Sequence, residues 1–396
     1  MILNRAMRVL HVINSLSGSG GAEQGLVREI TRFDDTVESL VVRLFEADDL
    51  QAKLVGRGIT VLALNLRSAR SGRTWPEAAR RVRRHIRAFG PDVIQTSLFI
   101  GNLVGQLAAA GTGIPVLSTL TLTGDDKLHK KLQPGAWKTR AAALRRLGAL
   151  VGRGKHVWYR ALTHDTAETN CTSMGIDKSR VTVIPRGVFV HRTAPDRARF
   201  GIPASVPLVV NVARIAVQKG QAHLLDAFRQ IKNVVPNAHL AIAGRGGDAS
   251  AAIQTKIVAL HLADSVHLLG YRPDVDVLLN SADLFVFSSL AEGLGTAVLE
   301  ALAVDLPVVA FDVPSLREVT DSGRYARLVP IGDTDQLASA SLDILMGRGT
   351  LSSSAWVSRN FSLDNVARSV QTALERLVKN PETAHSRIDR SCADEE

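Results

Sequence analysis

The sequence predicts an α/β protein with two doubly wound domains, and three observations support this prediction. Short apolar runs of strand length recur along the chain and alternate with longer runs of helical periodicity. The 396 residues are enough for two or three domains. A polar segment that contains two prolines, 189–206, interrupts the alternation. We therefore expect one domain over 1–188, a linker over 189–206 and a second domain over 207–360.

The first domain is expected to begin with a strand and a glycine-containing loop. Strands are predicted at 7–14, 37–44, 59–64, 92–96 and 115–121, helices from about Ala22 and over 75–89, and strand, helix and strand within 161–188. The loop before Ala22 does not match Gly-x-Gly-x-x-Gly with the downstream acidic residue that binds NAD. An NAD-dependent oxidoreductase is therefore disfavoured.

The second domain is expected to repeat the alternation and to end in a long helix. Strands are predicted at 208–212, 239–243, 266–269 and 284–287, a strand and a turn within 307–319, and helices from about Gln221, near 251–261 and at 333–347. The stretch 361–379 is amphipathic, and we expect a closing helix over 361–380. Residues 381–396 have the composition of a disordered tail.

The net charge of the chain is +10, and the excess of basic residues lies in the first half. Residues 1–195 contain 29 Lys or Arg against 15 Asp or Glu. No apolar run reaches the ~20 residues of a membrane helix, and no signal peptide is evident, so we expect a cytoplasmic protein. Cys171 and Cys392 stand far apart with no metal-binding spacing, so neither a disulfide framework nor a zinc site is expected.

The range 127–160 is strongly basic. It contains ten Lys or Arg and no acid, with Trp137, Trp158 and Tyr159 interleaved. Such a segment can lie on an anionic membrane surface, where each basic group contributes about 1 kcal/mol. The charge also suits nucleic acid, and a pair of solvated helices would account for it as well.

Two cations follow the first strand of the second domain. Arg214 and Lys219 lie five residues apart on the loop that leads from the strand's carboxyl end, which is where open parallel sheets bind ligands. The guanidinium of Arg offers several N–H donors in one plane, and the ammonium of Lys is a compact positive charge. This combination suits a diphosphate. Surface cations near a helix start are the alternative interpretation.

The range 283–307 reads as strand, loop and helix. The backbone N–H groups of Gly293, Leu294, Gly295 and Thr296 would lie at the helix start, where a phosphate is favoured. Glu292 and Glu300 frame this start and would stand on the order of 10 Å apart, too far to share a proton. They could instead hold hydroxyls at the two ends of an elongated ligand such as a nucleotide-sugar. The alternative is that both are solvated helix residues.

The stretch EGLGTAVLEALA resembles the Glu-x7-Glu signature of the retaining glycosyltransferases of family 4, which have the GT-B fold. VARIAVQKG is similar to the family pattern whose Arg and Lys neutralise the leaving nucleoside diphosphate. The resemblance implies two Rossmann-like domains facing a central cleft, a final helix that returns to the first domain, and no required metal or other cofactor. It implies that Glu292 orients the donor sugar and that Glu300 holds the ribose.

Further donor contacts are implied by the same resemblance. Gly20 and Gly21 would let substrate approach the backbone of the first loop closely. A His often ends the fifth strand in the family, where this chain has Thr121, so a hydroxyl would replace the imidazole. Relatives place the nucleobase near 244–246 and 270–272, which makes Arg245 and Tyr271 candidates.

We therefore expect a retaining glycosyltransferase that moves a sugar from a UDP- or GDP-sugar to a glycan or lipid-linked acceptor, in cell-surface polysaccharide or glycolipid synthesis. Many related enzymes use lipid-linked acceptors, which favours a membrane over nucleic acid as the partner of 127–160 and places the protein at the inner face of the cell membrane. A nucleotide-sugar epimerase or hydrolase of the same fold and a non-catalytic basic binding protein remain as alternatives.

Overall fold

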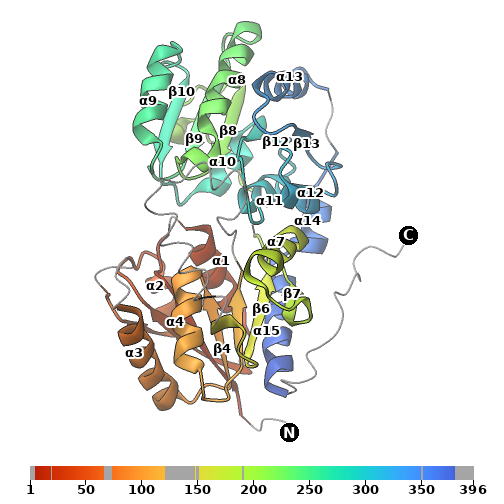
Figure 1. Cartoon of the computed structure of the whole chain (residues 1–396). Helices are drawn as coiled ribbons and strands as arrows, with labels where there is room; N and C mark the ends of the chain where they lie inside the picture. The colour runs from red at the N-terminus through yellow and green to blue at the C-terminus, as the bar shows by residue number, and fades with distance from the viewer. Residues whose placement is uncertain are drawn as a thin grey trace. The chain divides into compact units, whose positions relative to one another are not determined.

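The computed structural model describes residues 5–18, 20–66, 74–120, 148, 151–189, 191–348 and 351–379. These residues form two compact units (Figure 1). The first unit contains the described residues up to Gly187 and those from Leu363 onward, and the second is Val188–Ser362. The range 189–206, expected as a linker, therefore belongs to the second unit, where Phe200 and Ile202 are buried.

The first unit is built on a parallel sheet of seven strands in the order β3-β2-β1-β4-β5-β6-β7. The strands are β1 Met7–Ile13, β2 Val37–Arg43, β3 Thr60–Ala63, β4 Val93–Ser97, β5 Val116–Thr119, β6 Val157–Ala161 and β7 Val181–Val183. The order runs outward in both directions from β1 and β4, which confirms the doubly wound prediction.

Helices cover both faces of this sheet. They are α1 Gly21–Ile30, α2 Gln51–Val55, α3 Thr74–Phe89, α4 Phe99–Ala109, α7 His164–Met174 and α15 Leu363–Lys379. Successive strand residues point to opposite faces, so Leu10 and Val12 pack against α3 and α4. Val9 packs with the apolar face of α15 on the other side. The closing helix thus completes the core of the first unit.

Three elements of the first unit were missed or placed wrongly in the prediction from sequence. Helix α2 was not predicted, because five residues give too short a periodic signal. Helix α4 was not predicted, because most of its residues are buried and no amphipathic pattern marks it. The strand expected to open 161–188 is β6, which begins at Val157. Consequently Trp158, Tyr159 and Arg160, which were read as part of a basic surface segment, lie in the core.

Arg160 shows how a charged residue is accommodated there. Its guanidinium forms two hydrogen bonds with the carboxylate of Glu29 on α1, at 2.7 and 2.8 Å, and both side chains are almost fully buried. A buried charge needs such a partner. The remaining described residues of the basic range are 148 and 151–156, and the rest lies outside the described part of the chain.

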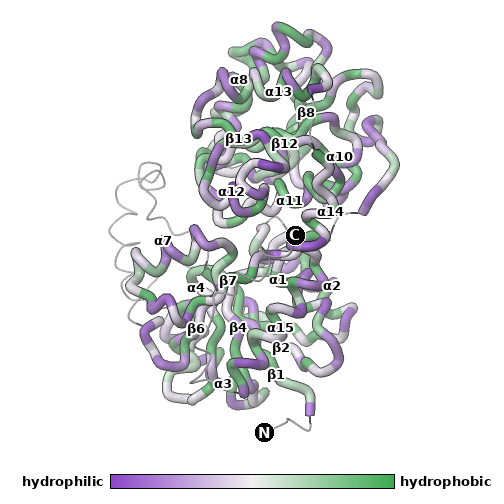
Figure 2. The backbone as a smooth tube through the Cα atoms, turned by 90° about the vertical axis from the view of Figure 1, so that its right-hand side faces the viewer, coloured by the Kyte–Doolittle hydropathy of each residue, from purple (hydrophilic) through white to green (hydrophobic). Residues whose placement is uncertain are grey.

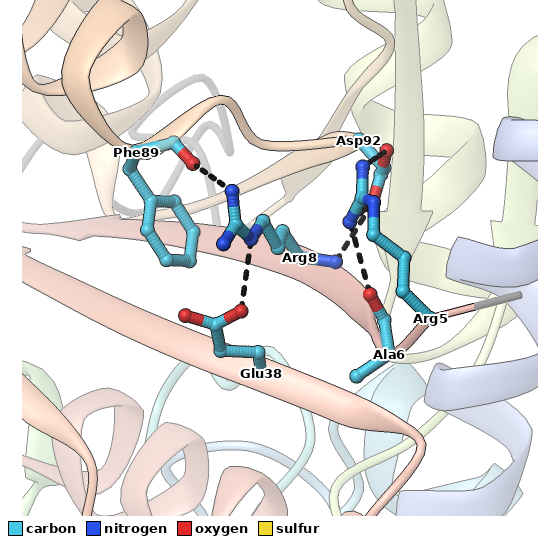
Figure 3. Close-up of polar contacts among 6 residues, drawn as sticks. All are labelled: Arg5, Ala6, Arg8, Glu38, Phe89 and Asp92. Carbon is cyan, nitrogen blue, oxygen red and sulfur yellow. Dashed lines mark hydrogen bonds and ion pairs between the residues drawn. The ribbon is translucent and has the colours of Figure 1, made fainter. Parts of the chain in front are cut away.

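The amino end of β1 is anchored by arginines (Figure 3). Arg8 donates to Glu38 at 2.9 Å and to the carbonyl of Phe89 at 3.0 Å. Its backbone N–H donates to Asp92, which also binds the guanidinium of Arg5. Arg5 and Arg8 therefore use their charges in contacts within the first unit.

The second unit has a parallel sheet of six strands in the order β10-β9-β8-β11-β12-β13. The strands are β8 Leu208–Val212, β9 His239–Ala243, β10 Val266–Gly270, β11 Leu284–Phe287, β12 Val308–Phe311 and β13 Arg327–Val329. Its helices are α8 Gln221–Val234, α9 Ser250–Ala259, α10 Val275–Ser281, α11 Thr296–Ala303, α12 Pro314–Val319, α13 Thr334–Leu345 and α14 Ser354–Phe361. This unit is also doubly wound.

Most elements of the second unit agree with the sequence prediction, and the short ones do not. The turn expected after β12 is the helix α12, which begins at Pro314. Strand β13 and helices α10 and α14 were not predicted, because three to eight residues give too short a periodic signal. Figure 2 shows hydrophobic residues in the interior of each unit and hydrophilic residues on outer turns and loops.

Candidate functional site

The strand order of the second unit marks one position on its sheet. After β8 the chain winds outward through β9 and β10, and after β11 it winds the opposite way through β12 and β13. The loops that follow β8 and β11 therefore diverge at the carboxyl edge of the sheet, and such a divergence is where doubly wound sheets bind ligands. The first loop carries Arg214 and Lys219, and the second carries Glu292 to Gly295.

The structure pairs two residues that the sequence assigned to different parts of a ligand. The Nζ atom of Lys219 lies 2.5 Å from Oε1 of Glu292. The side chain of Glu292 is 10% exposed and that of Lys219 is 21% exposed. Each charge sits in a mostly buried place, so each depends on the other for compensation. Lys219 also lies 5.9 Å from the ring centre of Phe287, at the end of β11.

Arg214 differs from Lys219 in being exposed. Its backbone carbonyl accepts a hydrogen bond of 3.0 Å from the side-chain amide of Gln221, which fixes the loop. Its guanidinium has no hydrogen bond or ion pair within the described residues. The guanidinium is therefore a cation beside the Lys219 and Glu292 pair that is available to an anion.

Helix α11 begins at this site. Its N-cap is Gly295, in the left-handed region at φ +83°, and no side chain caps the helix start. A Cβ atom on Gly295 would lie 2.4 Å from Leu316 of α12. Both the positive φ angle and the lack of room for a side chain therefore favour glycine at this position. The first N–H groups of a helix have no partner within it. Glu300 follows in the second turn and is half-buried.

The candidate base contacts come from the neighbouring strands. Arg245 and Tyr271 follow β9 and β10, and the guanidinium carbon of Arg245 lies 5.5 Å from the Tyr271 ring centre. The loops are joined by a 2.7 Å hydrogen bond from Gly244 N–H to the carbonyl of Gly270. Tyr271 is 40% exposed, so the pair presents a flat, cationic surface at the same sheet edge.

The first unit has its own divergence point, between β1 and β4, and the glycine loop lies there. Gly20 precedes α1, and a Cβ atom on it would lie 2.0 Å from the carboxylate of Glu23. Gly21 has open space around it. Glu23 accepts a hydrogen bond of 3.2 Å from Ser15, and burial raises its pKa. Glu23 was not predicted as a site residue, although its carboxylate follows Gly20 and Gly21 closely in the sequence.

Arg186 is a second residue of interest that the sequence did not assign to a site. It is buried, and it donates to the carbonyl of Ala22 at 3.0 Å. Gly25 makes room for it, because a Cβ atom there would lie 2.0 Å from the guanidinium. Burial lowers the pKa of Arg186. Thr121 lies outside the described residues, so its predicted contact stays a prediction.

No helix in the described ranges combines the length and apolar character needed to cross a bilayer. Within the same ranges, no three His, Cys, Asp or Glu residues gather as metal ligands would.

Two family models match this chain, one in each unit. Residues 193–355 match the model of glycosyl transferases group 1, and residues 18–187 match that of the glycosyl transferase 4-like domain. The two matched regions correspond to the two units. Together they indicate a glycosyltransferase of the GT-B fold.

Individual relatives match this chain over part of their length. An uncharacterized glycosyltransferase of Methanocaldococcus jannaschii is 40% identical over 103 residues, which is 26% of this chain and 25% of that protein. The amylovoran biosynthesis glycosyltransferase AmsK of Erwinia amylovora is 31% identical over 183 residues, which is 43% of this chain and 45% of AmsK. The alignment thus spans less than half of each of these relatives.

The solved structure of Anabaena HepE in complex with UDP and glucose matches almost the entire fold. The TM-score is 0.79 at 21% sequence identity, over 94% of this chain and 100% of HepE. At this identity the likeness shows the fold alone, and it confirms the predicted GT-B class.

Proposed function

We propose that this chain is a retaining glycosyltransferase of family 4 that transfers a sugar from a nucleotide-sugar donor to a glycan or lipid-linked acceptor. One observation carries the proposal. Two loops at the divergence point of the second sheet bring the exposed guanidinium of Arg214, the Lys219 and Glu292 pair, and the start of α11 to one edge. Cations and helix amides favour a diphosphate there, and the carboxylate favours a hydroxyl.

In this proposal the bond between the anomeric carbon and the diphosphate breaks, and the electron pair leaves with the nucleoside diphosphate. Arg214, Lys219 and the α11 amides stabilise the charge that develops on it. The loss of one such contact typically lowers the rate by ~10²–10³. The acceptor hydroxyl attacks the face from which the diphosphate departs, and its proton passes to the departing group. Glu292 orients the donor sugar, and Glu300 holds the ribose.

The proposed donor is a UDP- or GDP-sugar. HepE has been solved with UDP-glucose, and the fold shared with this chain makes a uridine donor the first to test. Arg245 and Tyr271 would lie against the base. A resident metal is not part of the proposal, and equal transfer rates with and without EDTA would support that. A rate that falls with EDTA and returns with Mg²⁺ would contradict it.

The acceptor proposal concerns cell-surface polysaccharide or glycolipid synthesis. AmsK takes its name from amylovoran biosynthesis, which supports a polysaccharide pathway. We further propose a peripheral position on the inner face of the cell membrane. Because Val157 to Arg160 are buried, we assign this contact within the described residues to exposed arginines of α3. These are Arg80, Arg84 and Arg87.

A thermal-shift panel of nucleotide-sugars tests the donor assignment. A ligand that binds only the folded state stabilises it by about 2.7 kcal/mol at a concentration of 100 Kd. We expect a UDP- or GDP-sugar to raise the melting temperature and R214A to abolish most of the shift. Transfer to an acceptor should then be lost in E292Q. Donor turnover without an acceptor product would favour an epimerase or hydrolase instead.

A further inference from the structure

The loops that carry Lys219 and Glu292 are joined by contacts that the proposed chemistry does not use. We call these contacts the loop seam, made by residues 218–220 and 288–291. Gln218 contributes to the seam twice. Its side-chain amide donates to the carbonyl of Ala291 at 2.8 Å, and its backbone carbonyl accepts from the N–H of Leu290 at 2.9 Å.

Ser288 and Gly220 complete the seam. The hydroxyl of Ser288, which is fully buried, donates to the carbonyl of Lys219 at 3.0 Å. Gly220 has φ +62°, and a Cβ atom there would lie 2.0 Å from the carbonyl oxygen of Ser288. The two loops therefore approach each other so closely that a side chain at position 220 would overlap the backbone of Ser288.

The seam lies directly beside the ion pair. Gln218 precedes Lys219 in the chain, and Ala291 precedes Glu292, so one side-chain amide links the backbones next to both charged residues. The carbonyl of Glu292 is held separately by the hydroxyl of Ser315 at 3.0 Å. A misplacement of about 1 Å in a catalytic group can lower a rate by roughly 10²-fold.

We propose that Gln218 and Ser288 are positioning residues that keep Lys219 and Glu292 in the geometry required for transfer. This proposal rests on the proposed function. In it, neither side chain touches the donor, because both donate to backbone carbonyls. Without the Gln218 amide, the carbonyl of buried Ala291 would lose its donor, and the loop would shift to regain one. The residues should therefore affect the rate of transfer more than donor binding.

Hydrogen exchange tests the seam without any donor. Q218M keeps the side-chain length but has no N–H group. Q230M is a matched control, because the amide of Gln230 also donates one hydrogen bond, to Asp335 at 2.7 Å, but this bond joins α8 to α13 and not the two site loops. We expect the amide of Leu290 to exchange at least about tenfold faster in Q218M and at the wild-type rate in Q230M. An unchanged rate in Q218M would overturn the proposal.

Transfer kinetics test the role in catalysis. We expect Q218M and S288A to lower kcat by about 10- to 100-fold, with the donor KM changed less than about threefold. Q218E places an acceptor against the Ala291 carbonyl and should lose at least as much activity as Q218M, whereas Q218K restores a donor and should recover activity. Wild-type kcat in Q218M, or an equal loss in Q230M, would show that the seam does not position the pair. If the wild type turns over no nucleotide-sugar, the proposed function fails, and the exchange result still decides whether the seam holds the loops.

Discussion

The pairing of Lys219 with Glu292 is the residue-level feature that the sequence could not provide. Both residues were identified as candidates, because cations and carboxylates next to strand ends are visible in the sequence. Their direct contact depends on how two loops, 73 positions apart, fold against each other. Periodicity carries no information about that contact, and neither does it reveal the buried partnership of Arg160 with Glu29.

Removal of one member of the pair should leave the other charge mostly buried and unpaired. We expect K219M to lower the free energy of unfolding by about 2 kcal/mol, less than for a fully buried pair because Lys219 is partly exposed. K256M is the control, since Lys256 pairs with Asp226 at 2.6 Å where both side chains are more exposed. It should change the stability by less than about 1 kcal/mol. Urea denaturation measures both, and equal effects would contradict the account.

His11 makes the stability of the first unit depend on pH. It is buried between Gln95 and Ser39, and desolvation lowers its pKa to about 4. Between pH 6.5 and 4 the unfolded chain binds a proton at this site and the folded chain does not, so stability falls as the pH falls. The loss should be about 3 kcal/mol. Urea denaturation at pH 6.5 and pH 4 measures the loss in the free energy of unfolding, which should be smaller by that amount in H11Q than in the wild type. An equal loss in the two proteins would contradict this role of His11.

At the scale of elements, long buried strands and amphipathic helices were predictable and several short or fully buried elements were not. Helix α15 was recognised from its apolar stripe, which packs on β1 and β4. Helix α4 gave no such stripe, and β6 was hidden in a basic stretch because its arginine is paired inside the core. Local patterns report one-sided burial, so elements buried all round escape them.

The close approach of the two site loops predicts a difference between two glycines. Gly220 and Gly201 have similar left-handed backbones, at φ +62° and +68°. A Cβ atom at Gly201 meets nothing within 4 Å, whereas one at Gly220 meets the carbonyl of Ser288. We expect G201A to cost about 1 kcal/mol of stability and G220A several times more, because G220A must also separate the loops.

Urea denaturation of both glycine variants provides the comparison. Activity offers a second readout, since G220A should lose donor-dependent transfer while G201A keeps it. Similar stabilities for the two variants would mean that the loops can separate without loss, and the seam would then have no structural basis.

At the scale of the whole molecule, the doubly wound order of both sheets followed from the alternation of strands and helices. The same alternation occurs in proteins with many functions, so the fold class alone did not identify an activity. The residues at the divergence point of the second sheet carried the functional prediction. The basic range 127–160 was a weaker guide, because its described strand is buried.

The membrane proposal predicts binding of the whole protein to anionic vesicles. Arg80, Arg84 and Arg87 are exposed on α3, and no ion pair engages them within the described residues. Replacing all three with Gln should weaken binding to phosphatidylserine-containing vesicles by about 1 kcal/mol for each charge. R229Q, on an exposed position of α8, is the control and should bind as the wild type does. Sedimentation with the vesicles at low salt measures this binding. If the wild-type protein stays in the supernatant, the exposed arginines of α3 do not form a membrane-binding surface.

The assignment of the donor site depends on where a nucleoside diphosphate binds. A crystal structure of the protein with UDP, and with GDP if UDP does not bind, measures this directly. We predict that the diphosphate contacts Arg214, Lys219 and the N–H groups at the start of α11, with the base beside Arg245 and Tyr271. A diphosphate that lies away from the loops after β8 and β11, or the absence of binding by both nucleotides, would contradict the account.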